Sequence, residues 1–441
     1  MLVTHAGFPT SVHKILFYLS FKQITTNTVA HTSYNLAETT PPKYLYLGMF
    51  PLEKDRPTNP SQRLESLDAL RGFDLFILTM LGPVMHTWIG HHPNETWAIA
   101  HWTHASWEGF LAWDLVMPLF MFMAGVSIPF AMSKYVGETA SLPRTHALLR
   151  IFRRVIVLWL LGCIAQGNLL AFNLDVFKPL TNTLQAIAIG YAGAALAFLF
   201  LDWKKQLALS VALLAIFTTG CFLFGEWQTV GASPWTRELN FPATLDKICL
   251  GRWRDCARLD TDGNVIFPGF YDTAWIWCSM TFIVTVMSGV FTGILLKNKM
   301  FSRSRKFWTL VVAGTGLVAL GWIGHIAGIP VIKRIWTGTF VLVSSGYCML
   351  LMAVFYGIID CLRWKRGLNW LKIIGMNSIL AYMLSPEVGL VNFNGISHPL
   401  LGGLLHVCEI TRPEIFFAVG NALILFLILW LCYRAKVFLK A

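Results

Sequence analysis

Apolar runs of about twenty residues recur along this chain, separated by shorter polar segments. They lie at 72–88, 110–132, 154–173, 183–201, 206–224, 275–296, 308–328, 338–358, 371–390 and 414–433. A helix of this length crosses the hydrocarbon core of a bilayer. Lipid offers no hydrogen-bond partners, so the backbone N–H and C=O groups of such a segment must bond to one another within a helix. The pattern predicts an all-α, polytopic integral membrane protein with about ten transmembrane helices.

Residues 1–62 do not follow this pattern. They are polar and rich in Thr and Pro, and their apolar run at 15–21 is too short for the h-region of a signal peptide. We expect a polar, poorly ordered N-terminal extension over 1–62, with Met49 as the natural start, and one transmembrane domain over 63–441.

The positions of Lys and Arg predict the orientation of the helices. Alternate polar segments carry clusters of them, at 54–71, 134–154, 204–205, 297–306, 363–372 and 434–440. The segment 89–109 has none, 174–182 has only Lys178, and 329–337 has Lys333 and Arg334. In the loop 225–274, five basic residues are offset by seven acidic ones. Because cytoplasmic loops retain basic residues, we expect both termini in the cytoplasm.

The formal net charge of +12 does not indicate a nucleic-acid partner. The basic residues form short clusters between apolar runs, as in proteins anchored in a lipid bilayer. The nine cysteines contain no C-x-x-C pattern, so we expect no cysteine-based metal site. Cys249 and Cys256 share one polar loop and would pair there if it faces an oxidising compartment.

The segment after the first apolar run carries the strongest chemical signal. It contains His91, His92, His101 and His104, and Asp114 follows inside the second run. A carboxylate within a transmembrane helix normally faces a cavity or a partner. We place residues 104, 108 and 111 on one face of a helix start, with Asp114 about two turns below. Asp114 would then fix the tautomer of His104, which suits a general base or a nucleophile.

Two other interpretations of this segment remain open. Several His together with Glu and Asp are able to hold zinc, although their spacing fits no standard zinc pattern. Alternatively, the His and Trp residues are interfacial side chains, polar at one end and apolar at the other. We expect no metal.

Short motifs run in order through the chain: Arg63–Gly72, His104–Gly109, Asp114–Phe120, Arg154 with Gly162, Leu184–Gln185 with Tyr191, and Gly375–Tyr382. In these stretches the chain resembles the heparan-alpha-glucosaminide N-acetyltransferase family and its bacterial relatives. The resemblance implies an acyltransferase that moves acetyl from cytoplasmic acetyl-CoA to an amino sugar such as glucosamine across the membrane. It also implies that His104 is catalytic, with Asp114 beside it.

The sequence departs from that family at several points. The large luminal domain of the animal enzymes is absent, which favours a bacterial cytoplasmic membrane over a lysosome. An Asn of the animal enzymes is replaced by Gly82, and the Arg expected after Gln185 by Ala186. These departures leave the acceptor open, whereas His104 and Asp114 are both present.

Further roles follow for polar residues near the apolar runs. We expect Arg150, Arg153 and above all Arg154 to bind the phosphates of acetyl-CoA, since guanidinium suits phosphate. The alternative is that these arginines only anchor the helix at the cytoplasmic face, a role that needs no ligand. Asn377 and Ser378 would donate to the thioester or to pantetheine, or else bond between helices. The residues expected to contact the sugar are Trp107, Glu108, Gln185 and Asp272, with the loop 225–274 as a lid.

Two rival functions fit the same sequence. One is O-acetylation of an envelope polysaccharide. The other is sugar transport, with His104 and Asp114 as a proton relay, although the chain has no convincing internal repeat of the kind common in transporters. The sequence does not exclude a homodimer.

Overall fold

The computed structural model describes residues 64–136, 141–228, 233–237, 239–255, 258–259, 264–266, 273–386, 388 and 390–439, and the backbone of Tyr44–Leu45. The remainder of the predicted extension 1–62 lies outside these residues. So do Asp272 and Cys256, so the sugar contact and the disulfide expected there stay predictions.

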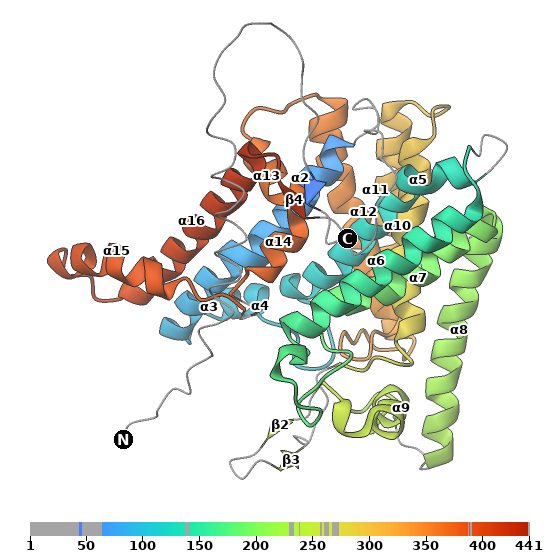
Figure 1. Cartoon of the computed structure of the whole chain (residues 1–441). Coiled ribbons are helices and arrows are strands. Elements are labelled where there is room, and N and C mark those ends of the chain that lie inside the picture. The colour runs from blue at the N-terminus through green and yellow to red at the C-terminus, as the bar shows by residue number, and fades with distance from the viewer. Residues whose placement is uncertain are drawn as a thin grey trace, which may run out of the picture. The chain divides into compact units, whose positions relative to one another are not determined.

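The described part of the chain is mainly helical (Figure 1). The transmembrane and connecting helices are α2 (Glu65–Phe76), η2 (Ile77–Leu81), α3 (Gly82–His91), α4 (Thr96–Trp102), η3 (Ala112–Leu115), α5 (Val116–Met132), η4 (Ser133–Tyr135), α6 (Arg144–Ala165), η5 (Leu169–Ala171), α7 (Thr183–Phe200), α8 (Trp203–Gln228), α9 (Phe241–Leu250), η6 (Gly251–Trp253), α10 (Ser279–Lys297), α11 (Arg303–Ile326), α12 (Gly338–Tyr356), η7 (Gly357–Cys361), α13 (Asn369–Met376), α14 (Ser378–Met383), α15 (Asn394–Val407) and α16 (Pro413–Arg434).

Strands are short. β1 (Tyr44–Leu45) pairs in parallel with β4 (Phe438–Leu439), and β2 (Arg258–Leu259) pairs in antiparallel with β3 (Val265–Ile266). The predicted all-α class therefore holds for the membrane part of the described chain.

Eight helical segments of the described chain are long and apolar enough to cross a bilayer, which supports a multi-pass membrane protein. They are Glu65–His91, Ala112–Tyr135, Thr183–Phe200, Trp203–Gly225, Ser279–Lys297, Arg303–Ile326, Gly338–Cys361 and Pro413–Arg434. Each coincides with one of the ten predicted apolar runs.

The other two predicted runs take a different form. The run 154–173 lies only in part in α6, which begins earlier, at Arg144, and ends at Ala165. The first half of α6 carries the arginines, and the run continues into the connection that contains η5. The run 371–390 is not one helix, because α13 ends at Met376 and α14 begins at Ser378. Asn377 leaves the helical conformation between them, with φ −116° and ψ 42°. The count of about ten continuous spans is corrected accordingly.

The core of the bundle is built around α10, which packs closely on α5. A Cβ atom on Gly125 of α5 would lie 2.0 Å from the carbonyl oxygen of Val286, and one on Gly289 of α10 would lie 2.0 Å from that of Phe122. Small residues at such a crossing let two backbones touch, which is the usual source of helix association in a bilayer. The two glycines therefore fix α5 rigidly against α10.

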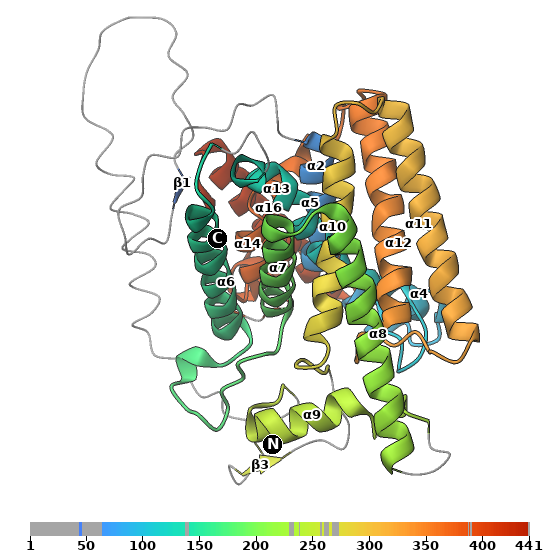
Figure 2. The same cartoon turned by 90° about the vertical axis from the view of Figure 1, so that its right-hand side faces the viewer.

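The connections gather at two ends of the bundle. Figures 1 and 2 show α9 and β3 at one end of the helices, and α2 and α13 at the other. The loops 89–109 and 329–337, together with the described residues of the segment 225–274, belong to the first end, called the outer end below. These loops, which are poor in Lys and Arg or balanced by acidic residues, therefore lie at one end, as the charge pattern predicts. The compartment that each end faces stays a prediction.

A buried carboxylate ties the outer loop to the bundle. Asp246 of α9 is fully buried and accepts the backbone N–H groups of Trp275 (2.7 Å) and Ile276 (2.9 Å), just before α10. Charge-assisted hydrogen bonds of this kind hold a loop in one position.

Candidate functional site

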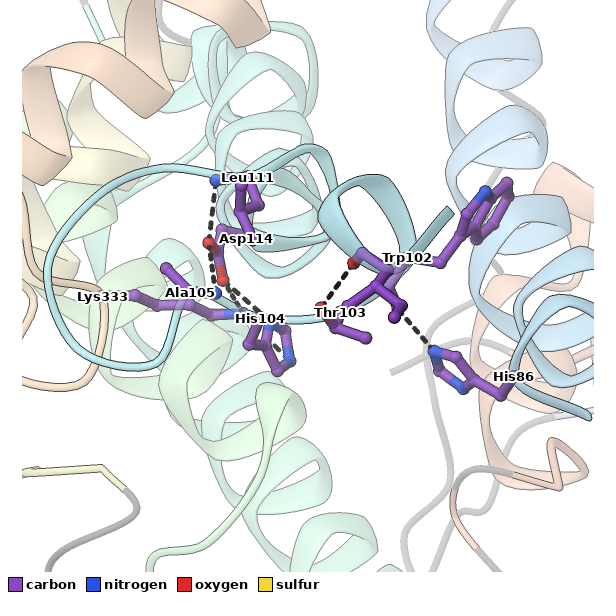
Figure 3. Close-up of polar contacts among 9 residues, drawn as sticks. His86, Trp102, Thr103, His104, Ala105, Leu111, Asp114 and Lys333 are labelled. Carbon is purple, nitrogen blue, oxygen red and sulfur yellow. Dashed lines mark hydrogen bonds and ion pairs between the residues drawn. The ribbon is translucent and has the colours of Figure 1, made fainter. Parts of the chain in front are cut away.

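The structure brings His104 and Asp114 into direct contact at the outer end (Figure 3). Nδ1 of His104 lies 2.7 Å from Oδ1 of Asp114. The carboxylate is fully buried, whereas 43% of the imidazole side chain is exposed. A carboxylate only accepts hydrogen bonds, so Nδ1 carries the proton and Nε2 keeps its lone pair. The imidazole therefore presents a basic nitrogen away from its carboxylate partner.

The local fold around Asp114 explains this contact. Asp114 belongs to the short helix η3, and its Oδ2 accepts the backbone N–H of Leu111 (3.0 Å) and of Ala105 (3.3 Å). These bonds fold the loop back over the carboxylate and turn Oδ1 toward His104. The expected helix start carrying residues 104, 108 and 111 on one face is therefore wrong, because His104 lies in a loop.

A third side chain completes the cluster and was missed as a site residue from the sequence. Nζ of Lys333 lies 3.0 Å from Nδ1 and 3.4 Å from Nε2 of His104, and 3.4 Å from Oδ1 of Asp114. Its side chain is only 16% exposed. One signal was available: Lys333 and Arg334 are basic residues in a loop that the charge pattern predicts to be poor in them.

The loop that carries Lys333 is held by backbone and hydroxyl contacts. The N–H of Gly109 donates to the carbonyl of Val331 (2.8 Å), and Glu108 forms an antiparallel bridge with Ile332. The hydroxyl of Thr337 accepts the N–H of Ile332 at 3.0 Å. The two loops therefore meet as a short ladder, which places Lys333 beside His104.

The surroundings of His104 favour a neutral imidazole, and the main cause is burial of the ring. Burial lowers the pKa of His104, and the nearby Lys333 and Arg334 lower it further, against the opposing hydrogen bond to Asp114. Burial lowers the pKa of Lys333 to about 8, although the negative charge of Asp114 opposes this. At neutral pH the site therefore holds a free base beside a protonated amine.

The other histidines near this loop are dispersed. His86 contacts the carbonyl of Trp102 through Nε2 at 2.7 Å, and His91 lies 3.6 Å from Glu414. His92 stacks on Trp88, with ring centroids 4.3 Å apart. In the part of the chain that the structure describes, no three His, Cys, Asp or Glu side chains gather as a metal site requires.

Two of the predicted sugar contacts line a cavity of about 540 Å³ at the outer end, namely Trp107 and Glu108. Trp235, Arg237 and His325 line it too, among others. Trp107 donates its indole N–H to the carbonyl of Trp235 (2.8 Å), and Nδ1 of His325 lies 3.5 Å from Glu108. Aromatic, acidic and imidazole groups thus share one concave surface, called the outer cavity below.

Gln185 lies elsewhere, and its side chain is fully engaged with the protein. It is completely buried; its Oε1 accepts the N–H of Thr181 (2.6 Å), and its Nε2 donates to the carbonyl of Pro179 (2.7 Å). These bonds organise the connection between α6 and α7, so the geometry gives Gln185 a role in the fold.

Arg154 and Ser378 line a second cavity, of about 310 Å³, between α2, α5, α6, α7, α13 and α14; it is called the inner cavity below. The guanidinium of Arg154 lies 4.2 Å from the centroid of the Tyr191 ring. Arg71 also lines the inner cavity and donates to the carbonyl of Met123 (3.3 Å). Two guanidinium groups therefore reach one space inside the bundle.

Other predicted cofactor residues are placed differently. Arg150 and Arg153 stand on α6 but do not belong to the lining of the inner cavity. Asn377 donates to the carbonyl of Val437 (2.9 Å) and accepts the N–H of Leu439 (3.0 Å). Its amide therefore holds β4 against the break between α13 and α14, while the neighbouring Ser378 faces the inner cavity.

Fold and site together define a helical, multi-pass membrane protein with a His–Asp–Lys cluster at the outer end of its bundle. Residues 63–226 match a domain of unknown function, DUF5009. That stretch includes His104, Asp114 and Arg154 but not Lys333. No curated protein matches the chain.

Proposed function

We propose that this protein is a membrane-embedded acetyltransferase that moves an acetyl group from acetyl-CoA to the amino group of an amino sugar such as glucosamine, across a bacterial cytoplasmic membrane. The observation that carries the proposal is the contact of His104 with the buried Asp114 at the outer end. The match of residues 63–226 to DUF5009 covers the stretch that carries this pair.

The chemistry needs a neutral amine, a base and a leaving thiolate. In a direct transfer, the amine nitrogen bonds to the acetyl carbon while its proton passes to Nε2 of His104. The carbon–sulfur bond then breaks, and the thiolate of CoA takes that proton. Asp114 orients the imidazole and stabilises its charged form between the two proton transfers. In the alternative two-step route, Nε2 itself accepts the acetyl group before the amine does.

The inner cavity suits the donor. Guanidinium groups make bidentate, charge-assisted contacts with phosphate, and Arg71 and Arg154 both line this space. The lining extends along α5 from Ala131 to Phe120, which lies six residues, or about 9 Å of helix rise, from Asp114. We place the nucleotide near Arg154 and direct the pantetheine arm toward His104.

The outer cavity suits the acceptor. Its volume of about 540 Å³ falls in the range of small-molecule sites. Trp107 and Trp235 contribute apolar surface to its lining, and Glu108 contributes a carboxylate suited to the amino or hydroxyl groups of a sugar. Glu108 stands on the same loop as His104, although His104 and Lys333 are not among the residues that line this cavity.

One observation favours a second candidate, transfer to a sugar hydroxyl. Nζ of Lys333 lies 3.4 Å from Nε2, so a protonated amine entering this site would meet another cation. A hydroxyl acceptor meets no such repulsion. The same charge does not exclude the amino group, because an amine must lose its proton before it reacts. The positive charge of Lys333 disfavours the protonated amine and so favours the neutral, reactive form.

The test is release of CoA thiol by purified protein in lipid nanodiscs. Acetyl-CoA is supplied with a panel of amino sugars and with neutral sugars that carry only hydroxyl groups. We expect thiol release with amino sugars and a loss of about 10²–10⁴-fold for His104→Ala, as for removal of a general base. The exposed His406 gives a matched control, His406→Ala, with the wild-type rate.

Three outcomes would oppose the proposal. Retention of the wild-type rate by His104→Ala would remove the assigned base. Release only with neutral sugars would move the reaction to O-acetylation. Uptake of sugar into proteoliposomes without any thiol release would indicate a transporter.

A further inference from the structure

We propose that Lys333 is a catalytic residue of the transfer, whose ammonium stabilises the negative charge that develops on the acetyl oxygen. This inference rests on the proposed function and adds a group that the sequence did not assign. It concerns a side chain from the loop between α11 and α12, 229 positions from His104 in the chain.

The position of Lys333 fits this role. The acceptor gives its proton to Nε2, so the carbon under attack must lie beside that nitrogen. Nζ of Lys333 is 3.4 Å from Nε2, which puts an oxyanion formed there within reach of its N–H groups. A preorganised cation at the site of developing charge is a principal source of rate enhancement in acyl transfer.

A purely structural ion pair would have a different geometry. Nζ lies closer to Nδ1 of His104 (3.0 Å) than to Oδ1 of Asp114 (3.4 Å), although Nδ1 carries a proton and offers Lys333 no acceptor. Oδ1 already receives the shorter bond from His104, at 2.7 Å. Asp114 therefore compensates the charge of Lys333 only in part, and the ammonium keeps bonding capacity toward a ligand.

The surrounding loop keeps the lysine in place. Thr337 donates its hydroxyl to the carbonyl of Pro330 (2.9 Å), and Thr339 donates to the same carbonyl (2.8 Å). Together with the ladder to Gly109, these bonds restrain the loop on both sides of Lys333. Little reorganisation is then needed when the transition state forms.

Lys333 keeps its proton throughout the reaction. The carbonyl oxygen gains a negative charge as the acceptor–carbon bond forms, and the ammonium meets it. As the carbon–sulfur bond breaks, the electron pair on that oxygen re-forms the carbonyl double bond and the negative charge leaves with the sulfur. The resulting thiolate receives the proton held by His104. Atoms and charge balance without any further reactant.

The experiment compares Lys333→Met, Lys333→Arg and a matched control, Lys247→Met, which changes an exposed lysine of α9. For Lys333→Met we expect a fall in kcat of about 10²–10³-fold, the range for loss of one oxyanion donor, with little change in the KM for acetyl-CoA. Lys333→Arg keeps the charge and should recover part of the rate. Lys247→Met should match the wild type.

The pH profile separates catalysis from mere folding. Burial is the main cause of the lowered pKa of His104; Asp114, in η3, raises that pKa, while Lys333 and Arg334, from the α11–α12 loop, lower it. Removing Lys333 should therefore move the acidic limb of kcat/KM to higher pH. Lys333→Met with a wild-type kcat would overturn the proposal, as would a variant whose only defect is a lower melting temperature.

A double variant and a spectroscopic readout complete the test. If Lys333 and His104 act on one transition state, His104→Ala with Lys333→Met should be hardly slower than His104→Ala alone; fully additive losses would contradict this. An inactive wild type would refute the acetyltransferase itself. The contact between Lys333 and His104 can then still be measured by NMR, because Lys333→Met should raise the titration midpoint of the His104 imidazole. An unmoved midpoint would overturn the assigned interaction of Lys333 with His104.

Discussion

Replacement of Asp114 by Asn is the sharpest probe of the His–Asp pair, because it removes a charge and almost no volume. In Asp114→Asn, the new carbonyl oxygen can keep the backbone N–H groups of Leu111 and Ala105. The new NH₂ group then faces Nδ1 of His104, where a donor would meet a donor. This clash is relieved when the imidazole carries its proton on Nε2 instead of Nδ1. Nε2 then has no lone pair with which to accept the proton of the acceptor.

The size of the effect follows from the bonds that change. Loss of one charge-assisted hydrogen bond costs about 1.5–3 kcal/mol, or roughly ten- to 150-fold in rate. The exchange of tautomers adds to this and takes the upper limit to about 10⁴-fold. Lys333 also loses its nearest carboxylate, so we expect a lower melting temperature as well.

The direction in which the pH profile of kcat/KM shifts gives an independent test of the role of Asp114. Asp114 raises the pKa of His104, so Asp114→Asn lowers it and moves the acidic limb of kcat/KM to lower pH. Lys333→Met moves the same limb in the opposite direction. Initial rates of CoA thiol release, measured across the range in which imidazole titrates, report both shifts.

Asp246→Asn is the matched control, since it also removes a fully buried carboxylate that accepts two backbone N–H groups. It should lower the melting temperature and leave the pH profile of the folded protein unchanged. A wild-type rate for Asp114→Asn, or equal shifts of the pH profile in both variants, would refute the assigned role of the carboxylate.

Two further predictions concern the donor and the orientation. Arg154→Ala should raise the apparent KM for acetyl-CoA by roughly ten- to a hundredfold, because a charge-assisted phosphate contact is lost. Arg154→Lys should reverse part of this rise in KM. An unchanged KM in Arg154→Ala would show that Arg154 only anchors the helix. Cysteine at Glu95 should react with an impermeant maleimide added to intact cells, whereas cysteine at Ser302 should not; labelling of the Ser302 variant would reverse the orientation.

The membrane architecture was largely predictable because it depends on local properties. Length and hydropathy alone define a segment that must be helical in lipid, so eight runs appear where they were expected. The errors arose where polar groups compete with the helix. Asn377 interrupts an apolar run because its amide bonds β4, a partner 60 or more residues away, which no local pattern contains.

The candidate site was predictable only in part, for a related reason. His104 and Asp114 lie ten positions apart, so a local argument was able to pair them, even though a loop rather than a helix joins them. Lys333 reaches them through tertiary contacts between two loops. Gln185 was expected to contact the sugar; in the structure its amide bonds nearby backbone groups, and the sugar contact itself stays a prediction.

The packing of α5 bears on the choice between an enzyme and a carrier. This helix follows directly from η3 with Asp114 and lines the inner cavity from Phe120 onward. It is locked to α10 by backbone contact at Gly125 and Gly289. In a carrier with alternating access, one group of helices moves against another, and α5 and α10 would have to move together within one group. An acetyltransferase needs only a fixed frame, along which the flexible arm of its donor reaches a base held at the outer end.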